Sequence, residues 1–373
     1  MKRLLSVVFF TFIITMGCAQ DNPPFIETPT ALNYTYETVV DGIEIPWGMA
    51  FIQANDFLVT EKSGILYRVK DGVKSSVDGL PEIYVRGQGG LLDVALHPDF
   101  SNNNIIYMTL SANTEEDDEG GNTSLYCAKL NGTSLEEVKL LYKATPNTKK
   151  GQHWGSRIVF DQEGHVYFSI GDRGDRDVNP QDVTRDGGKI YRLNLDGSVP
   201  KDNPFVGQEK AKEAIFSYGH RNPQGMTVHP KTGQVWENEH GPQGGDEINI
   251  IQSGVNFGWP VITYGINYSG TPITDKTSMP NMAQPFYYWV PSIAPSGMAF
   301  SSSGVYEDWK EDLFVGSLKF EYLERLIIEN DKVVKREKVL DKIGRVRNVV
   351  EGTDGYLYLA VEGKGILKIV PNK

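Results

Sequence analysis

A unit of short β-strands recurs along the chain, and this repetition restricts the possible folds more than any other feature of the sequence. Each copy has an apolar strand that begins near a Gly or Ser, a turn, a second strand with an apolar–Tyr–apolar pattern, and a third strand. The clearest copy reads GSRIVFDQEG, HVYFSIGD and KIYRLNLDG. Roughly six units of three or four strands predict an all-β fold, a six-bladed β-propeller.

Two further expectations follow from this repeat. The strand at residues 37–40 is expected to complete the last blade, which would close the ring and leave no exposed edge. Long insertions are expected after the second strand of the middle copies, on the face where loops carry function. A β-sandwich with strands that are similar by chance is the alternative fold.

The N-terminus is typical of an export signal. Lys2 and Arg3 precede an apolar run, residues 4–14, that is too short to span a bilayer, and Gly17 precedes Cys18. This pattern predicts a lipoprotein-type signal peptide at 1–17, a lipid on Cys18, a tether at 18–35 and the propeller at 36–373. Thr15 is atypical of the motif, so simple secretion is the alternative. We expect an exported protein, periplasmic or anchored to the outer membrane by that lipid alone.

Charge and cysteine content argue against several kinds of partner and against an internal disulfide. The net charge of −11 argues against binding to nucleic acid or to anionic membrane surfaces. Cys127 is the only cysteine besides Cys18, so no internal disulfide is expected in spite of the oxidising compartment. In so acidic a chain, a group of arginines at one place requires an explanation.

The stretch at residues 216–259 combines a strand pair with two dense polar loops. Its apolar strands are separated by the turn at residues 230–233. The loops read GHRNPQG at 219–225 and EHGPQGGDE at 239–247. A purely structural loop needs Gly and Pro for its backbone angles, but it does not also need Arg, Asn, Gln, His and two acids. The loops therefore predict the walls of a binding site.

His153 is the candidate general base. It lies in the loop GQHWGSR, directly before the inner strand of a blade, so it is expected to face the channel. A histidine titrates near neutral pH and can accept a proton there. Asp172, which follows the next strand of the same blade, could orient that histidine or bind sugar hydroxyls. The alternatives are a histidine that only bonds to a loop and an Asp–Gly turn that only caps a strand.

Cations from three blades form a second group of candidates. Arg345 and Arg347 are one residue apart, so in a strand both would point to the same side. If the propeller is right, these residues converge on the channel, and guanidinium groups suit bidentate binding of carboxylates. A small polyanionic ligand is therefore expected. The members of this group are Arg221, with Asn222 and Gln224 beside it, Lys319, Arg345 and Arg347.

A site for a hard cation is the third candidate. The Gly241–Pro242 turn can present adjacent backbone carbonyls, and Asp246 and Glu247 offer carboxylates nearby. Such oxygen ligands suit calcium. The acidic run at residues 114–120 is a weaker candidate, and we interpret it as a solvated loop.

Motifs along nearly the whole mature chain, in the same order, resemble the glucose/sorbosone dehydrogenase family. Within that family the chain is similar to the soluble, pyrroloquinoline-quinone-dependent aldose sugar dehydrogenases, which are six-bladed propellers. The segments that carry the resemblance are GQGGLLDVALHPDF, GQHWGSR, SIGDRGD, GGKIYRLNLDGSVPKDNPF, GHRNPQG, EHGPQGGDEIN, NFGWP, APSGMAF and GRVRNVVEGTDGYLYLA.

The resemblance implies a role for each matching residue. His153 would take the proton of the anomeric hydroxyl, and Gln88 would lie near the base and the cofactor. Gly241 and Pro242 would provide the backbone ligands of a catalytic calcium ion, while Glu247 and the Phe257 carbonyl would bind a further, structural one. The residues implied to hold the quinone are Arg221, which would also polarise its reactive carbonyl, Asn222, Lys319, Arg345 and Arg347, with Gln224 beside them.

The implied activity is oxidation of aldoses to aldonolactones by a monomer that passes electrons to an external acceptor. Gln152 stands where the dimeric glucose enzymes have an aspartate, and bulky Trp154 follows the histidine, so a broad range of aldoses is expected. A calcium-dependent propeller lactonase is one alternative, although it would need more Asp, Glu and Asn around a metal. A non-catalytic carbohydrate-binding propeller is another, although it would need no base beside an anion site.

Overall fold

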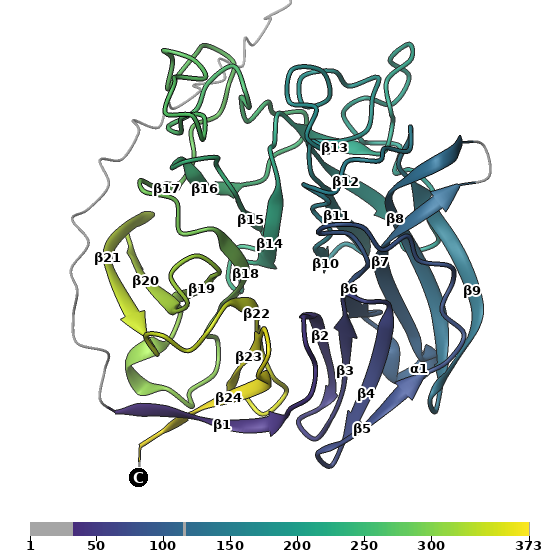
Figure 1. The fold of residues 1–373 in the computed structure, drawn as a ribbon, viewed down its shortest axis with the longest axis vertical. Coiled ribbons are helices and arrows are strands. Elements are labelled where there is room, and N and C mark those ends of the chain that lie inside the picture. Colours follow the sequence, from purple (N-terminus) through teal and green to yellow (C-terminus); the bar gives the residue numbers. More distant parts are fainter. Residues whose placement is uncertain (1–32, 115–116, 373) are drawn as a thin grey trace, which may run out of the picture.

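Six four-stranded antiparallel sheets surround a central channel in the computed structural model, which describes residues 33–114 and 117–372 (Figure 1). The sheets follow one another around the ring in chain order, so the predicted six-bladed β-propeller is confirmed. The predicted signal peptide at 1–17, Cys18 and most of the predicted tether lie outside the described residues.

Each blade pairs its strands in sequence order from the channel outwards, and only the last blade also uses the N-terminal strand. Blades 1 to 3 consist of β2 (Pro46–Gln53), β3 (Asp56–Glu61), β4 (Ile65–Lys70) and β5 (Val73–Val77); β6 (Leu91–Leu96), β7 (Ile105–Thr114), β8 (Asp117–Asn131) and β9 (Ser134–Lys143); and β10 (Ile158–Phe160), β11 (His165–Ile170), β12 (Lys189–Asn194) and β13 (Ile215–Tyr218). Blades 4 to 6 consist of β14 (Pro223–Val228), β15 (Val235–Glu239), β16 (Asp246–Ile250) and β17 (Tyr287–Trp289); β18 (Pro295–Phe300), β19 (Leu313–Ser317), β20 (Leu323–Glu329) and β21 (Lys332–Val339); and β22 (Val346–Glu351), β23 (Leu357–Val361), β24 (Gly365–Pro371) and β1 (Tyr34–Val40).

Strand β1 closes the ring by pairing with β24, as predicted for residues 37–40. The antiparallel register joins Tyr34 to Pro371 and Thr38 to Leu367. The strand begins at Tyr34, so the last residues assigned to the tether belong to the propeller. Blade 6 therefore contains both ends of the folded chain, which gives β24 a partner on each side.

The core lies between neighbouring blades rather than inside one sheet. β3 and β23 are buried along their whole length because both faces of each sheet pack against a neighbour. Between blades 5 and 6, for example, Phe314, Val349 and Leu359 belong to one apolar cluster. Such strands become nearly continuous apolar runs, which explains why the repeat is visible in the sequence.

One end of the channel collects most of the polar loops. The first and second strands of every blade are antiparallel, so the residues before each first strand lie at the same end as the residues after each second strand. In blade 3 a long insertion, residues 171–188, follows the second strand as predicted. In blade 4 the prediction was wrong, because the long segment at residues 251–286 follows the third strand, β16.

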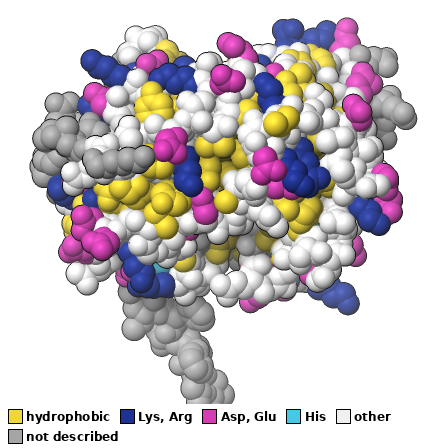
Figure 2. Space-filling model, turned by 90° about the horizontal axis from the view of Figure 1, so that it is seen from below, with side chains coloured by type: hydrophobic (Ala, Val, Ile, Leu, Met, Phe, Trp, Pro, Cys, Tyr) yellow, Lys and Arg dark blue, Asp and Glu magenta, His cyan; other side chains and the backbone are white. Residues whose placement is uncertain are grey.

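The outer surface carries charges of both signs. Figure 2 shows one side of the ring, where Lys and Arg alternate with Asp and Glu and no large patch has a single sign. The helices of the described residues, α1 (Phe100–Asn103) and η1 (Glu307–Trp309), are about one turn long and could not cross a bilayer. The interpretation of the acidic run at residues 114–120 as a loop was wrong for its described residues, because Thr114 ends β7 and residues 117–120 begin β8; residues 115 and 116 are outside the described part.

Candidate active site

His153 and Asp172 form a hydrogen-bonded pair at the loop-rich end of the channel. Nδ1 of His153 lies 2.6 Å from Oδ1 of Asp172, and Nε1 of Trp259 donates to Oδ2 of the same carboxylate at 2.9 Å. Burial lowers the pKa of His153 below its usual 6.5, Asp172 partly offsets this, and Arg221 and Arg173 lower it further. Although burial opposes its charge, the pKa of Asp172 is held below its usual value by His153 and Arg221.

These shifts define how the pair is protonated at neutral pH. The carboxylate of Asp172 is ionised and accepts Nδ1–H, while the imidazole of His153 is neutral. The lone pair is then on Nε2, for which the described residues provide no hydrogen-bond partner. The side chain of His153 is 16% exposed, so Nε2 can act as a proton acceptor for a bound molecule.

The loop that carries His153 has an unusual backbone. His153 has φ 56°, and Ser156, three residues later, has φ 111°. The loop is packed against Gly171, where a Cβ atom would lie 2.4 Å from the carbonyl oxygen of His153. The backbone N–H of His153 donates to Oε1 of Gln88 at 2.9 Å. Strained backbone of this kind persists where surrounding contacts enforce it and is frequent at functional sites.

Arg221 extends from blade 4 next to this pair. Its Nη1 donates to the carbonyls of His240 at 2.8 Å and Gly241 at 3.1 Å. Its guanidinium lies 5.4 Å from the ring centre of Trp259, whose indole holds Asp172. Arg221 is buried and forms no ion pair with a described carboxylate. Its positive charge is therefore available to a bound anion.

His240 marks the point where several candidates converge. Burial and then the charges of Arg221, Arg347 and His153 lower the pKa of His240 to about 3, although its hydrogen bond to the Pro295 carbonyl opposes the shift. These influences come from blades 3, 4 and 6, so the residues face a common space. His240 was not predicted as an individual site residue from the sequence, although it lies in one of the two polar loops.

Asn222 and Gln224 connect blades 3 and 4 beneath the site. Oδ1 of Asn222 accepts the backbone N–H of Gly155 and also Nε2 of Gln224. Gln224 donates in addition to the Gly155 carbonyl at 3.2 Å. Both side chains are buried, so in this structure they brace the His153 loop.

Gln152 and Trp154, on either side of His153, have different environments. Gln152 is exposed, which fits its expected influence on the substrate. Trp154 is completely buried, and the Arg173 guanidinium lies 3.3 Å from its ring centre. Trp154 therefore supports the loop from below, which corrects the expectation that its bulk would shape the substrate pocket.

The remaining cations lie in blades 5 and 6. Arg345 and Arg347 point to the same side, as predicted, since both bind the carboxylate of Glu362, a partner that was not predicted from the sequence. Arg345 also donates to the Leu318 carbonyl, which places it beside Lys319. Lys319 is exposed and has no carboxylate partner among the described residues. Three cations share one fixed negative charge here, so the group keeps an excess of positive charge.

A cavity of about 10 Å³ is lined by Arg221, with Trp259 and Glu239 among its other walls. This volume suits one water-sized atom or ion. Its lining includes three of the four residues implied to bind calcium, namely Gly241, Glu247 and Phe257, but not Pro242. Burial and the charge of Glu239 raise the pKa of Glu247 well above its usual value, which a cation in the cavity would reverse.

Asp246 is not available to a metal ion in this structure. Its carboxylate accepts the backbone N–H groups of Gly241, Ile293 and Ala294 and the hydroxyl of Ser292. The suggestion that Asp246 offers a metal ligand is therefore wrong. The residue instead fixes the Gly241–Pro242 turn against blade 5. The carbonyl of Pro242 itself has no hydrogen-bond donor among the described residues.

A buried cluster of His220, Glu237 and Glu239 lies next to this cavity. Their ligand atoms lie within 4.8 Å of one another, and Oε2 of Glu237 is buried without a partner. Burial opposes the charge of His220, but Glu237 and Glu239 raise its pKa to about 9. Glu239 also accepts the backbone N–H groups of Arg221 and Asn222. The alternation of Glu237 and Glu239 within one strand could have revealed this pair.

Comparison with known proteins connects this site to a family. The model of the glucose/sorbosone dehydrogenase family matches residues 43–368. An aldose sugar dehydrogenase of Escherichia coli, YliI, is 39% identical over 346 residues, which is 90% of this chain and 92% of that protein.

Solved structures give the same result. The apo-form of the soluble aldose sugar dehydrogenase from Escherichia coli superimposes with a TM-score of 0.87 at 37% identity, covering 91% of this chain and all of that one. The PQQ-bound form of an aldose sugar dehydrogenase from Streptomyces coelicolor has a TM-score of 0.73 at 25% identity, covering 92% of this chain and 100% of that one.

Proposed function

Because the chain belongs to the glucose/sorbosone dehydrogenase family, a family of oxidoreductases, we propose that it oxidises aldose sugars at the first carbon with pyrroloquinoline quinone (PQQ) and calcium. The observation that carries this proposal is the His153–Asp172 pair beside the unpaired guanidinium of Arg221. A neutral base next to a fixed positive charge suits removal of a proton from a hydroxyl group whose carbon is being oxidised.

The residues present fit an anionic quinone. PQQ carries carboxylates, and Arg221 and Lys319 are cations without a carboxylate partner among the described residues. Arg345 and Arg347 add two charges against the single Glu362. Asn222, Gln224 and Gln88 provide amide groups around the same loop. Cations from three blades would together hold the cofactor.

The residues present also fit calcium, which prefers oxygen ligands. The free carbonyl of Pro242 and the shared carbonyl of Gly241 would provide the catalytic site. Glu247 and the Phe257 carbonyl, which line the 10 Å³ cavity, would provide the structural one. When bound, the quinone would supply the hydride acceptor and calcium a Lewis acid that polarises its carbonyl.

The protein's own part in the reaction follows from its geometry. Asp172 holds Nδ1–H of His153, so Nε2 accepts the proton of the anomeric hydroxyl. Arg221 keeps a positive charge where negative charge develops, with its guanidinium fixed by two carbonyls. Loss of a proton from oxygen and a hydride from carbon converts the aldose to an aldonolactone, and the two electrons leave for an external acceptor.

Dye reduction by the purified protein tests the proposal. We expect aldoses to reduce an artificial dye only when both PQQ and calcium are present. Replacing the base, His153→Gln, should lower kcat by about 10²- to 10⁴-fold, the range for loss of a general base. His97→Gln is the matched control, because His97 follows β6 at the opposite end of the channel.

The outcomes separate the alternatives. Failure of the protein to bind PQQ would exclude this function and favour the calcium-dependent lactonase. Binding of PQQ without oxidation of any aldose would retain the cofactor and exclude the substrate class. The proposals of a monomer and of a lipid on Cys18 are tested separately, by light scattering and by mass spectrometry of the exported protein.

A further inference from the structure

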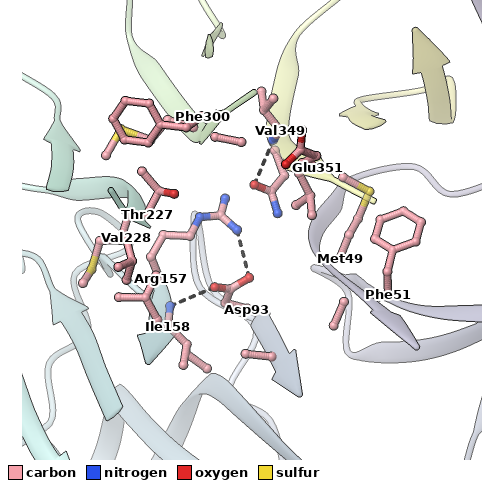
Figure 3. Close-up of a pocket in the computed structure, with 18 of the residues that line it drawn as sticks. Met49, Phe51, Asp93, Arg157, Ile158, Thr227, Val228, Phe300, Val349 and Glu351 are labelled. Atoms are coloured by element: carbon pink, nitrogen blue, oxygen red, sulfur yellow. Dashed lines mark hydrogen bonds and ion pairs between the residues drawn. The ribbon is translucent and has the colours of Figure 1, made fainter. Parts of the chain in front are cut away.

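The side chain of Arg157 lies across the middle of the central channel. Arg157 directly precedes β10, and its guanidinium points to the centre of the ring, where it meets Asp93 of β6 (Figure 3). Only 3% of the residue is exposed. No role in the proposed function requires it, and a buried charge at this position is costly unless it is well paired.

One guanidinium group connects five of the six blades. Nε donates to the Gln224 carbonyl in blade 4 at 2.8 Å, and Nη2 donates to the Arg347 carbonyl in blade 6 at 3.1 Å. Nη1 donates to the Trp47 carbonyl in blade 1 at 3.1 Å and to Oδ1 of Asp93 in blade 2 at 2.9 Å. Arg157 itself belongs to blade 3.

The propeller geometry explains why carbonyls are available there. Each inner strand lies at the end of its sheet, so one edge of its backbone is unpaired and faces the channel. A buried carbonyl without a donor is costly. The planar guanidinium offers five donors in a fixed arrangement, which a lysine cannot imitate.

The three carbonyls belong to residues beneath the candidate active site. Arg347 and Gln224 are proposed cofactor residues. Trp47 supports Arg347, whose guanidinium lies 4.4 Å from the indole ring centre, and its Nε1 donates to Ser156 in the His153 loop at 3.0 Å. A shift of the Arg157 guanidinium would therefore move the groups that hold both the cofactor and the base.

On the other side of Arg157 the channel widens into a chamber of about 440 Å³. It is lined by Arg157, by Asp93, and by the later residues of the inner strands, such as Thr227, Phe300 and Val349 (Figure 3). Arg157 and Asp93 thus form the partition between this chamber and the candidate site.

We propose that Arg157 is a positioning residue, which fixes the floor of the cofactor site by holding the carbonyls of Trp47, Gln224 and Arg347. The inference rests on the proposed function for its effect on PQQ, but the positioning itself can be measured without the cofactor. The conservative Arg157→Lys variant cannot reach three carbonyls and a carboxylate at once, so it should behave almost like Arg157→Ala.

The test compares Arg157→Ala with Arg336→Ala, which removes another buried arginine, one that pairs with Glu324 in blade 5. We expect Arg157→Ala to weaken PQQ binding at least tenfold and Arg336→Ala to leave it within twofold, even if both lower the Tm. Guanidinium ions at millimolar concentration should restore PQQ binding to Arg157→Ala alone, because they can fill the vacated space from the chamber.

Hydrogen exchange provides the readout that needs no cofactor. Backbone amides of residues 47–49, 222, 224–225 and 345–348 should exchange faster in Arg157→Ala, with protection restored by guanidinium, and should be unchanged in Arg336→Ala. If Arg157→Ala does not fold, the double variant Arg157→Met/Asp93→Met replaces it, since substitution of a buried ion pair by apolar residues is often tolerated.

Unchanged hydrogen exchange and unchanged PQQ affinity in a folded variant would overturn the inference. Wild-type protein that cannot bind PQQ would instead overturn the proposed function, and the exchange data would still decide the role of Arg157.

Discussion

At the scale of single residues, the His153–Asp172 pair shows how burial and hydrogen-bond partners determine whether a histidine is neutral and which of its nitrogens can accept a proton. Burial alone would favour a neutral imidazole, and Asp172 opposes that shift while fixing the proton on Nδ1. Trp259 in turn fixes the carboxylate. The balance leaves a base that is neutral at physiological pH, and a carboxylate that orients it.

The first prediction concerns Asp172→Asn and the pH profile. His153 must be unprotonated to act, so kcat/KM should fall on the acid side of a pKa below 6.5. The carboxylate of Asp172 raises that pKa, so its loss should move the acid limb to still lower pH. The rate at pH 7 should fall about a hundredfold because the imidazole loses its orientation.

Steady-state rates between pH 4 and 9 measure both effects. A folded Asp172→Asn variant whose acid limb moves to higher pH would contradict this account of the pair. Asp161→Asn is a control, because Asp161 bonds to His165 in the same manner at 2.8 Å but outside the candidate site.

The sequence pointed to the candidate residues but to only some of their partners: Asp172 was a candidate to orient His153, and the structure pairs the two. His153, Arg221 and the two arginines of blade 6 stand out by type and spacing. Glu362, which binds Arg345 and Arg347, lies after a different strand, and no local pattern connects it to them. The burial of Trp154 and the full use of Asp246 also depend on packing between segments far apart in the chain. Residue type and spacing therefore singled out candidate residues, whereas contacts between distant segments required the structure.

At the scale of elements, the strands were predictable, whereas only the insertion of blade 3 was placed correctly. A strand reveals itself through apolar residues, since both faces of each blade are buried. The segment at residues 251–286 has no such pattern, and the insertion of blade 4 was expected after the second strand rather than after the third. Its position matters, because Phe257, Trp259 and Thr263 of this segment line the small cavity.

The second prediction concerns β1, which closes the ring. Deletion of residues 1–40 should leave an edge of β24 unpaired and remove Val40 from the core shared with Phe57 and Ile366. Each lost backbone hydrogen bond costs about 1 kcal/mol, so we expect a loss of several kcal/mol. The exposed edge should also promote association between copies.

Thermal unfolding and size-exclusion chromatography test this expectation. A chain that begins at residue 33 retains β1 and is the reference for the deletion. An equal Tm and a monomeric profile for both chains would show that closure by β1 contributes nothing to stability.

At the scale of the whole molecule, the repeat determined the fold and the site depended on it. Six similar units bring loops from distant parts of the chain to one end of a channel, so the convergence of His153, Arg221 and Arg347 could be predicted once the propeller was recognised. The partition by Arg157 could not be predicted. It depends on the distance across the ring, which the sequence does not encode locally.

The last prediction is that calcium stabilises the entire propeller. The chain has a net charge of −11, and Glu239 and Glu247 line the small cavity. A cation bound there offsets both the repulsion between these two carboxylates and the cost of burying their charge. A ligand at a hundred times its Kd adds about 2.7 kcal/mol to the free energy of unfolding. Calcium should therefore raise the Tm by several degrees, and a chelator should reverse the increase.

Glu247→Gln should lose most of this shift. Glu163→Gln, in the surface cluster with Asp161 and His165, should keep it. A shift that vanishes in Glu163→Gln and persists in Glu247→Gln would place the calcium on the surface and remove it from the site.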